Sequence, residues 1–269
     1  MKLLSLLCLL VLVTFVSSCE QEKSNTEKYN LDNKRISTAS IVNGVDVQSD
    51  DLEAKSTVAI YDKSFFSFCT GVLVDKRYVL TAAHCVKDIN INFLILGFGL
   101  KNLQHNPSAK VDLVNIADEE SHPEYLLGRS FPDIAVIKLA QDAPDGYLPV
   151  EMSEYASDIE VGVDFSIAGY GKTKNQKIVP NLRKALVRVN DVKLLESNSS
   201  FKYTKIGHGG GCNGDSGAPA YRLINNKLVL IGILSGGDDA NCMMANGILS
   251  SIPHNIKWIK STIEKLNQN

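Results

Sequence analysis

Short apolar runs separated by turn residues are the feature that most constrains how this chain can fold. Such runs favour strands, and their number relative to helical patterns favours a single β-rich domain in a chain of 269 residues. The last residues differ, because Ile256, Ile259, Ile263 and Leu266 recur at spacings of three and four, which predicts one closing helix from His254 onward. The predicted strands are residues 58–61, 70–74, 78–81, 93–97, 111–116, 133–139, 165–168, 184–192, 228–234 and 247–252.

The N-terminus has the pattern of an export signal. Lys2 precedes an apolar run over residues 3–16, which is shorter than the roughly 20 residues that a membrane-spanning helix needs. The small residues that follow predict a signal peptide over residues 1–18. The segment 16–19 (VSSC) resembles the lipobox of bacterial lipoproteins, in which the cysteine, here Cys19, is lipidated. Ordinary cleavage near Ser18 is the alternative.

Residues 19–40 form a polar segment between the signal and the apolar runs. They contain too few large apolar groups to fold, so we expect a tether or pro-segment here, attached to a folded domain over residues 41–269. Export predicts disulfides, and the four domain cysteines allow three pairings. These cysteines are Cys69, Cys85, Cys212 and Cys242.

Several classes of ligand are not expected. With 28 basic and 30 acidic residues and no basic patch, the chain gives no reason to expect nucleic acid. The glycine-rich run 207–211 lacks the Gly-Lys-Ser/Thr ending of a phosphate loop, so no nucleotide cofactor is predicted. The chain has no Cys-x-x-Cys zinc spacing, and His105, His208 and His254 have no partner pattern, so no metal site is predicted.

The run Gly211–Pro219 (GCNGDSGAP) places a serine on a glycine-rich turn. Glycines let backbone N–H groups point inward and form a hollow that binds an anion. Taken alone, the run could also be a surface loop. A candidate base, His84, lies in the string LTAAHC, and a candidate acid, Asp133, begins the string DIAVIKL. A serine needs such a base to become a nucleophile, so the three residues together indicate acyl-transfer chemistry.

The order His84, Asp133, Ser216 and the strings around these residues resemble the chymotrypsin/trypsin family of serine endopeptidases. The resemblance extends from Ile41 to the C-terminal helix, and residues 122–125 (HPEY) match one of the family's surface loops, in which His122 is structural. It implies an all-β fold of two six-stranded antiparallel Greek-key β-barrels with a C-terminal α-helix. The strings that carry it are LTAAHC (80–85), DIAVIKL (133–139), GYG (169–171), GDSGAP (214–219), GILS (232–235) and WI (258–259).

The resemblance also implies a role for each site residue. Ser216 attacks the peptide carbonyl, His84 accepts and returns the proton, and Asp133 orients the imidazole. The backbone N–H groups of Gly214 and Ser216 form the oxyanion hole. In the activated enzyme the amine of Ile41 pairs with Asp215.

Activation and disulfide pairing follow from the same resemblance. It implies a zymogen that an activating protease cleaves before Ile41. Residues 39–40 (AS) are not basic, so a trypsin-like activator is not expected to cut there, although Lys34 and Arg35 lie nearby. The implied disulfides are Cys69–Cys85 and Cys212–Cys242, which leaves Cys19 for lipidation. Residues 89–110 lack acids, so the calcium loop of some relatives is not matched.

The implied specificity pocket has an uncharged base at Gly210. We expect its walls to leave it open, which predicts a chymotrypsin- or elastase-like preference for large apolar residues, although Asp238 and Asp239 at the rim could attract a basic side chain. The edge segment, residues 235–237, would pair with an extended substrate. The predicted edge and wall residues are Ser235, Gly236, Gly237 and Gly247.

These observations predict an exported serine endopeptidase that acts on proteins and peptides as a monomer. It would need no cofactor. It would be anchored through Cys19 and face the periplasm or cell surface, or be secreted after cleavage before Ile41. The alternative is a catalytically silent homologue that serves as a binding or adhesion module.

Overall fold

The structure is a computed structural model of the chain. It describes residues 41, 44–62, 67–99, 111–126, 128, 130–171, 181–193, 199–206, 209–237 and 246–268. All of these belong to one compact unit, residues 36–269. The predicted signal peptide, the tether with Cys19, and Cys242, Asp238 and Asp239 lie outside the described residues.

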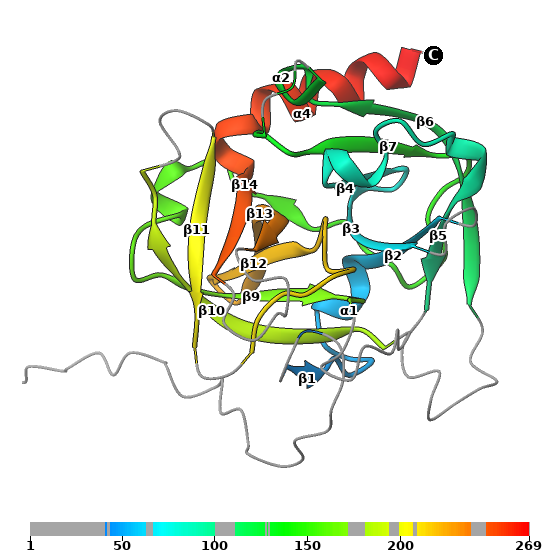
Figure 1. Ribbon diagram of the computed structural model, residues 1–269. Helices are drawn as coiled ribbons and strands as arrows, with labels where there is room; N and C mark the ends of the chain where they lie inside the picture. The colour runs from blue at the N-terminus through cyan, green and yellow to red at the C-terminus, as the bar shows by residue number, and fades with distance from the viewer. Residues whose placement is uncertain are drawn as a thin grey trace, which may run out of the picture. The chain divides into compact units, whose positions relative to one another are not determined.

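The first half of the domain closes into a six-stranded antiparallel barrel (Figure 1). Its strand order is β2-β3-β4-β7-β6-β5. Apolar side chains such as Val58, Ile60 and Leu96 fill its interior. The strands are β2 (Thr57–Asp62), β3 (Ser67–Asp75), β4 (Tyr78–Thr81), β5 (Leu94–Phe98), β6 (Asp112–Ser121) and β7 (Ala135–Leu139).

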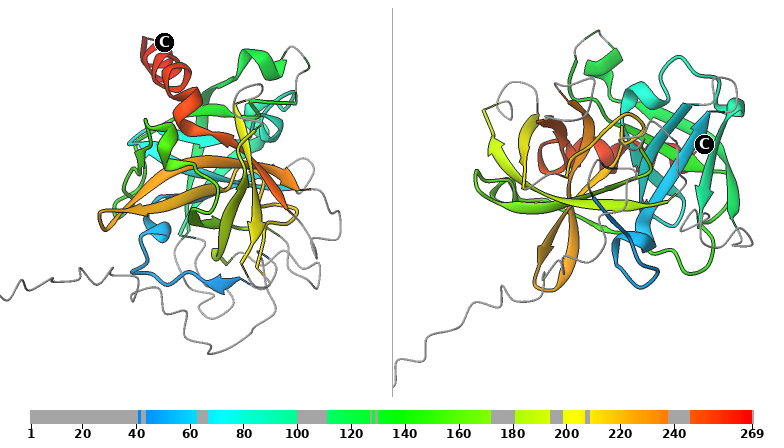
Figure 2. Two further views of the ribbon diagram at one scale, coloured as in Figure 1. Left: turned by 90° about the vertical axis from the view of Figure 1, so that its left-hand side faces the viewer. Right: turned by 60° about the horizontal axis from the view of Figure 1, so that its bottom comes forward.

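The second half forms another closed ring of six antiparallel strands, because β12 and β10 both pair with β9. The β12–β13 hairpin, orange in Figure 2, turns at Asn225 and Asn226, whose positive φ angles of 49° and 61° suit a tight hairpin turn. Around the ring the strands are β9 (Asp164–Gly169), β10 (Arg183–Asp191), β11 (Ser200–Lys205), β14 (Gly247–Ser251), β13 (Lys227–Gly237) and β12 (Pro219–Ile224).

The remaining elements are short, apart from the last helix. Strand β1 (Val45–Asp46) pairs with β10, and β8 (Glu151–Met152) pairs in parallel with β13. Helix α4 (Ile252–Gln268) follows β14 directly and buries its apolar side, including Ile259 and Leu266. The short helices are α1 (Glu53–Ser56), α2 (Pro123–Leu126), η1 (Ala83–Cys85), η2 (Ile91–Phe93) and η3 (Ala156–Asp158). No helix among the described residues is long and apolar enough to span a bilayer.

The predicted architecture of two six-stranded antiparallel barrels with a terminal helix is confirmed. Strands β11 and β12 were not predicted, because neither has the clear apolar run of the other strands. Residues 123–125, predicted as loop, belong to the single helical turn α2.

The two barrels meet at Thr70, in β3. Its backbone N–H donates to the carbonyl oxygen of Ser216 (2.7 Å), and its Oγ1 donates to the carbonyl oxygen of Gly214 (3.2 Å). The glycine-rich turn of the second barrel is thus held against the first barrel, which carries His84 and Asp133.

Candidate active site

His84 and Asp133 form a doubly bonded pair within the first barrel. Asp133 Oδ2 lies 2.7 Å from Nδ1 of the His84 ring, and Oδ1 accepts from the backbone N–H of His84 at 3.0 Å. The carboxylate side chain is 3% exposed, whereas the imidazole is 36% exposed. A buried acid on Nδ1 fixes the tautomer of a histidine and leaves Nε2 as the nitrogen for proton transfer.

Two serines of the second barrel also bind Asp133. Ser235 Oγ, in β13, donates to Oδ2 of the carboxylate at 2.5 Å. Ser250 Oγ, in β14, donates to the backbone carbonyl of Asp133 at 3.0 Å. The sequence suggested Ser235 only as part of a substrate-binding edge, and nothing in it indicated a role for Ser250. The acid is therefore positioned by both barrels.

The turn that carries Ser216 requires its glycines. Gly214 and Gly217 have φ angles of 96° and 80°, which side chains rarely allow. A Cβ at Gly217 would lie 2.1 Å from the carbonyl oxygen of Thr70. The N–H of Gly217 donates to the carbonyl oxygen of Leu234 at 2.7 Å, which fixes the turn against β13.

The turn leaves two donors available for a substrate. Within the described part of the chain, no hydrogen bond uses the backbone N–H of Gly214 or of Ser216. Both residues are partly exposed. Such N–H groups can stabilise an oxyanion that forms on a substrate carbonyl.

Asp215 and Ile41, the predicted activation pair, are brought together in the interior. Both are fully buried, and the backbone N–H of Ile41 donates to the Asp215 carboxylate. The same carboxylate accepts from the N–H groups of Gly171 (2.7 Å) and Cys212 (2.8 Å). Burial raises the pKa of Asp215 to about 7, although these bonds and the charge of Arg183 oppose the shift.

Arg183 is a buried cation that the sequence did not single out. It is 1% exposed, its Nε lies 3.5 Å from Asp46 Oδ1, and its guanidinium donates to the carbonyl oxygen of Gly44. It therefore ties the segment after Ile41 to β10 and adds positive charge near Asp215.

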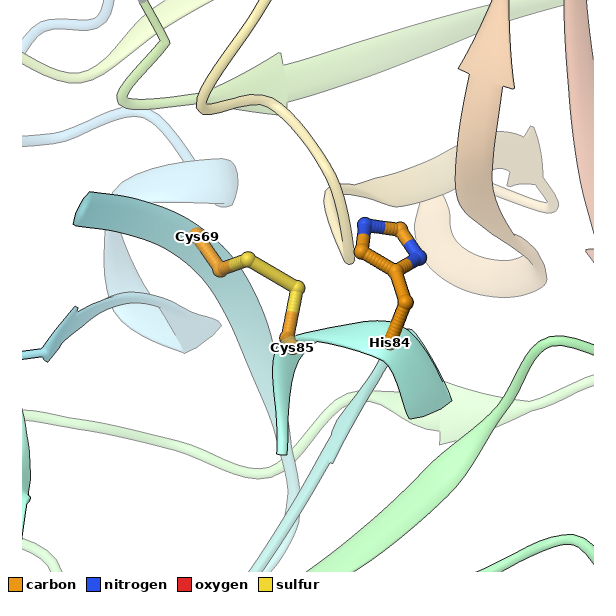
Figure 3. Close-up of side chains that lie close together, drawn as sticks. All are labelled: Cys69, His84 and Cys85. Carbon is orange, nitrogen blue, oxygen red and sulfur yellow. A yellow bond between two sulfur atoms is a disulfide. The ribbon is translucent and has the colours of Figure 1, made fainter. Parts of the chain in front are cut away.

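The predicted disulfide between Cys69 and Cys85 is present and lies beside the His84 ring (Figure 3). Cys212 is also disulfide-bonded, and its predicted partner Cys242 lies outside the described residues. Ligand atoms of Cys69, His84 and Cys85 lie within 4.8 Å of one another. The two sulfurs are bonded to each other, so neither is a thiolate that could bind a metal.

The predicted pocket glycines differ in their surroundings. Gly236 faces open space, as expected. A Cβ at Gly210 would lie 3.1 Å from Lys205 Cε, so this position borders the methylenes of a lysine. Gly247 does not face open space, because a Cβ there would lie 1.9 Å from Tyr203 Cε1.

His122 is a structural residue, as expected. It is 9% exposed, its ring centroid lies 4.7 Å from that of Trp258, and its Nδ1 accepts from the N–H of Glu124 at 3.3 Å. Burial lowers the pKa of His122, and nearby Glu124 opposes this shift. These contacts attach α2 to α4.

Comparison with the sequences of known proteins places this chain in a family. The family profile described as Trypsin matches residues 41–259. The chymotrypsin-like elastase family member 1 of Bos taurus is 28% identical over 216 residues, which cover 74% of this chain and 80% of the relative. The Homo sapiens protein of the same name is 29% identical over 220 residues, covering 74% and 83%. The CLIP domain-containing serine protease C9 of Anopheles gambiae is 28% identical over 228 residues, covering 75% and 61%. The fold, the paired His84 and Asp133 and the profile match together show that this chain belongs to the trypsin family of serine proteases.

Proposed function

We propose that this chain is an exported serine endopeptidase that hydrolyses peptide bonds through an acyl-enzyme on Ser216. The observation that carries the proposal is the buried Asp133 carboxylate bonded to both the ring and the backbone of His84. A serine protease needs its base held in this way, because the imidazole must accept a proton and then exist briefly as a cation beside the acid.

The chemistry follows from the roles of the three residues. Ser216 Oγ attacks the carbonyl carbon of the scissile bond and passes its proton to His84 Nε2. The N–H groups of Gly214 and Ser216 stabilise the oxyanion, a contribution of roughly 3–4 kcal/mol per donor. His84 then protonates the leaving amine, and a water molecule activated by the same imidazole releases the acyl group from Ser216.

Cleavage before Ile41 would mature the enzyme. In the uncut chain the nitrogen of Ile41 is a neutral amide that donates to Asp215. Cleavage converts it into an ammonium beside a buried carboxylate, which strengthens the interaction that holds the 214–217 turn in place. The activator must accept Ala39-Ser40, or a cut near Lys34 and Arg35 must be followed by trimming.

Export and anchoring complete the proposal. We propose that Cys19 is lipidated and that residues 20–40 act as a membrane tether, so that cleavage before Ile41 both activates and releases the domain. Mass spectrometry of the mature N-terminus, followed by membrane fractionation, tests this idea. A fully active enzyme that stays membrane-bound through an intact segment 19–41 would contradict it.

Reaction with a fluorophosphonate probe tests the enzymatic proposal. The chain released with Ile41 as its first residue should be labelled, and Ser216→Ala and His84→Ala should not be. Ser153→Ala is a control for the loss of a serine hydroxyl elsewhere, because Ser153 is buried and its Oγ bonds Asp158. A folded, cut chain that the probe does not label would favour the catalytically silent binding module.

A further inference from the structure

Two backbone segments border the specificity pocket that the family resemblance implies. One is the approach to Ser216, residues 209–212, and the other is the end of β13, residues 235–237. Leu234 forms two backbone hydrogen bonds with the turn that carries Ser216. Its carbonyl oxygen accepts from the N–H of Gly217 (2.7 Å), and its N–H donates to the carbonyl oxygen of Ala218 (2.9 Å). The family resemblance implies that the residue before a cleaved bond places its side chain between these segments.

The interior of this space is occupied by Tyr203, from β11. Its Oη accepts a hydrogen bond from the N–H of Gly211 at 3.2 Å. A Cβ at Gly211 would lie 3.1 Å from Tyr203 Oη and 2.8 Å from Leu234 Cδ2. A Cβ at Gly247 would lie 1.9 to 2.5 Å from Cε1, Cζ and Oη of the same ring. Both glycines therefore face the tyrosine, whose ring takes up the space beside them.

Tyr203 is fixed in this position by its neighbours. It pairs across the strands with Gly247, which pairs in turn with Gly237 of β13. Its ring makes an edge-to-face contact with Phe165, with centroids 6.0 Å apart and an interplanar angle of 86°. The side chain is 1% exposed. Displacing a side chain from such a close-packed interior to admit a substrate would cost free energy.

Among the described residues, the edge of the space at Gly236 is open, in contrast to its interior. A Cβ at Gly236 would have no heavy atom within 4 Å. A small side chain would therefore have room beside Gly236, whereas a large one would have to displace the Tyr203 ring that packs against Gly211 and Gly247.

We propose that Tyr203 is the floor of the primary specificity pocket and restricts cleavage to bonds that follow small side chains, such as Ala, Ser or Val. This inference rests on the proposed endopeptidase activity. It replaces the preference for large apolar residues that an open pocket would have given. Tyr203 acts by excluding large side chains, and it takes no part in the chemical step.

A series of peptide nitroanilides that differ only in the residue before the cleaved bond tests the proposal. With Ala, Val, Leu, Phe and Lys at that residue, kcat/KM for Ala or Val should exceed that for Phe and Lys at least about tenfold. Tyr203→Leu keeps the site apolar but removes the hydroxyl and ring edge, so the Phe/Ala ratio should rise at least about tenfold. Phe201→Leu is the matched control, because Phe201 lies in the same strand and apolar cluster but packs against Gly232, so it should leave the ratio unchanged.

A second variant keeps the test decisive if Tyr203→Leu does not fold. Gly236→Val narrows this open edge without disturbing the interior, and it should lower kcat/KM for Val and Leu more than for Ala. A wild-type enzyme that cleaves after Phe at least as well as after Ala would overturn the inference while leaving the peptidase intact. The same holds for a folded Tyr203→Leu enzyme with an unchanged ratio. A chain that cleaves no substrate and takes no fluorophosphonate would overturn the proposed function, and this inference with it.

Discussion

The backbone N–H of Ile41 donates a hydrogen bond to the carboxylate of Asp215 in a chain that has not been cut between Ser40 and Ile41. Ile41 is fully buried and has a φ angle of 46°, a conformation that β-branched residues rarely adopt. Because the nitrogen of Ile41 is an amide in the uncut chain, it offers the carboxylate a hydrogen bond but no positive charge. The buried acid is costly in its charged form, and the cost can be measured.

Stability of the uncut chain should fall as pH rises through the titration range of Asp215. Its pKa is raised from 3.8 to about 7, so between these values the folded state holds a proton that the unfolded state has lost. This contribution is fully present below about pH 4 and is lost by about pH 7, with a total of about 4 kcal/mol. Urea unfolding of Ser216→Ala, which cannot digest itself, measures the trend.

A comparison of Ser216→Ala with the double variant Ser216→Ala, Asp215→Asn isolates the contribution of the Asp215 carboxyl group. The difference between their free energies of unfolding should change with pH over this range. Asp145→Asn, at an exposed position, is the matched control and should leave the slope of the free energy of unfolding against pH unchanged. After cleavage the Ile41 ammonium favours the ionised form of Asp215, so stability should depend less steeply on pH. A difference between the Asp215 and Asp215→Asn chains that does not change with pH would contradict the prediction.

Removal of the Ser235 hydroxyl should slow the chemical step. Ser235 Oγ donates to Asp133 Oδ2 at 2.5 Å, and a bond to a carboxylate is stronger than one between neutral groups. We expect Ser235→Ala to lower kcat about tenfold and to leave KM nearly unchanged, because the backbone of the substrate-binding edge is retained.

Ser250→Ala separates this effect from a general loss of packing. Ser250 Oγ bonds the backbone carbonyl of Asp133, so its removal should cost about 1 kcal/mol of stability with a smaller fall in kcat. Ser235→Thr, which keeps a hydroxyl, should restore much of the rate. If Ser235→Ala raised KM and left kcat unchanged, the serine would act on substrate binding and not on Asp133.

The sequence was sufficient to predict the two-barrel fold, and its strings included His84 and Asp133, which the structure pairs. Apolar runs such as residues 133–139 give strand signals, and the strings around His84 and Ser216 are specific. Strand β11 was missed because Ser200–Lys205 mixes polar and aromatic residues, and its alternation is visible only once the partners are known.

The supporting contacts of the site could not have been predicted in the same way. Tyr203, Ser250 and Arg183 act through partners that lie on other strands, and pairing across a barrel is not encoded in local spacing. Gly247 is an example, because a Cβ there would meet Tyr203, which the sequence did not indicate. A glycine in a strand indicates that another group approaches the backbone closely, but it does not identify the side chain that does so.

Gly171→Ala should disturb the Asp215 pocket directly. A Cβ at Gly171 would lie 2.4 Å from Asp215 Cγ and 2.5 and 2.6 Å from its two carboxylate oxygens. Overpacking of a close-packed interior costs about 1–3 kcal/mol, and the displaced carboxylate would also lose the bond from Gly171 N–H. Urea unfolding in the Ser216→Ala background measures the loss. Gly236→Ala, which meets no atom, should fold with nearly unchanged stability, and equal stabilities for the two variants would contradict the prediction.

Loss of the Cys69–Cys85 disulfide should weaken both the fold and the base. The bond joins cysteines 16 positions apart, and a loop of that length corresponds to about 3 kcal/mol of stability. Because Cys85 follows His84 directly in η1, the unbraced turn should also hold the imidazole less firmly, and kcat should fall. The double variant Cys69→Ala, Cys85→Ala avoids leaving a free thiol, and urea unfolding in the Ser216→Ala background measures the stability. The active-site effect is measured as the rate of fluorophosphonate labelling of the cut chain at a temperature where the variant is fully folded. A labelling rate equal to that of the wild type, despite the lower stability, would show that the disulfide braces the barrel but not His84.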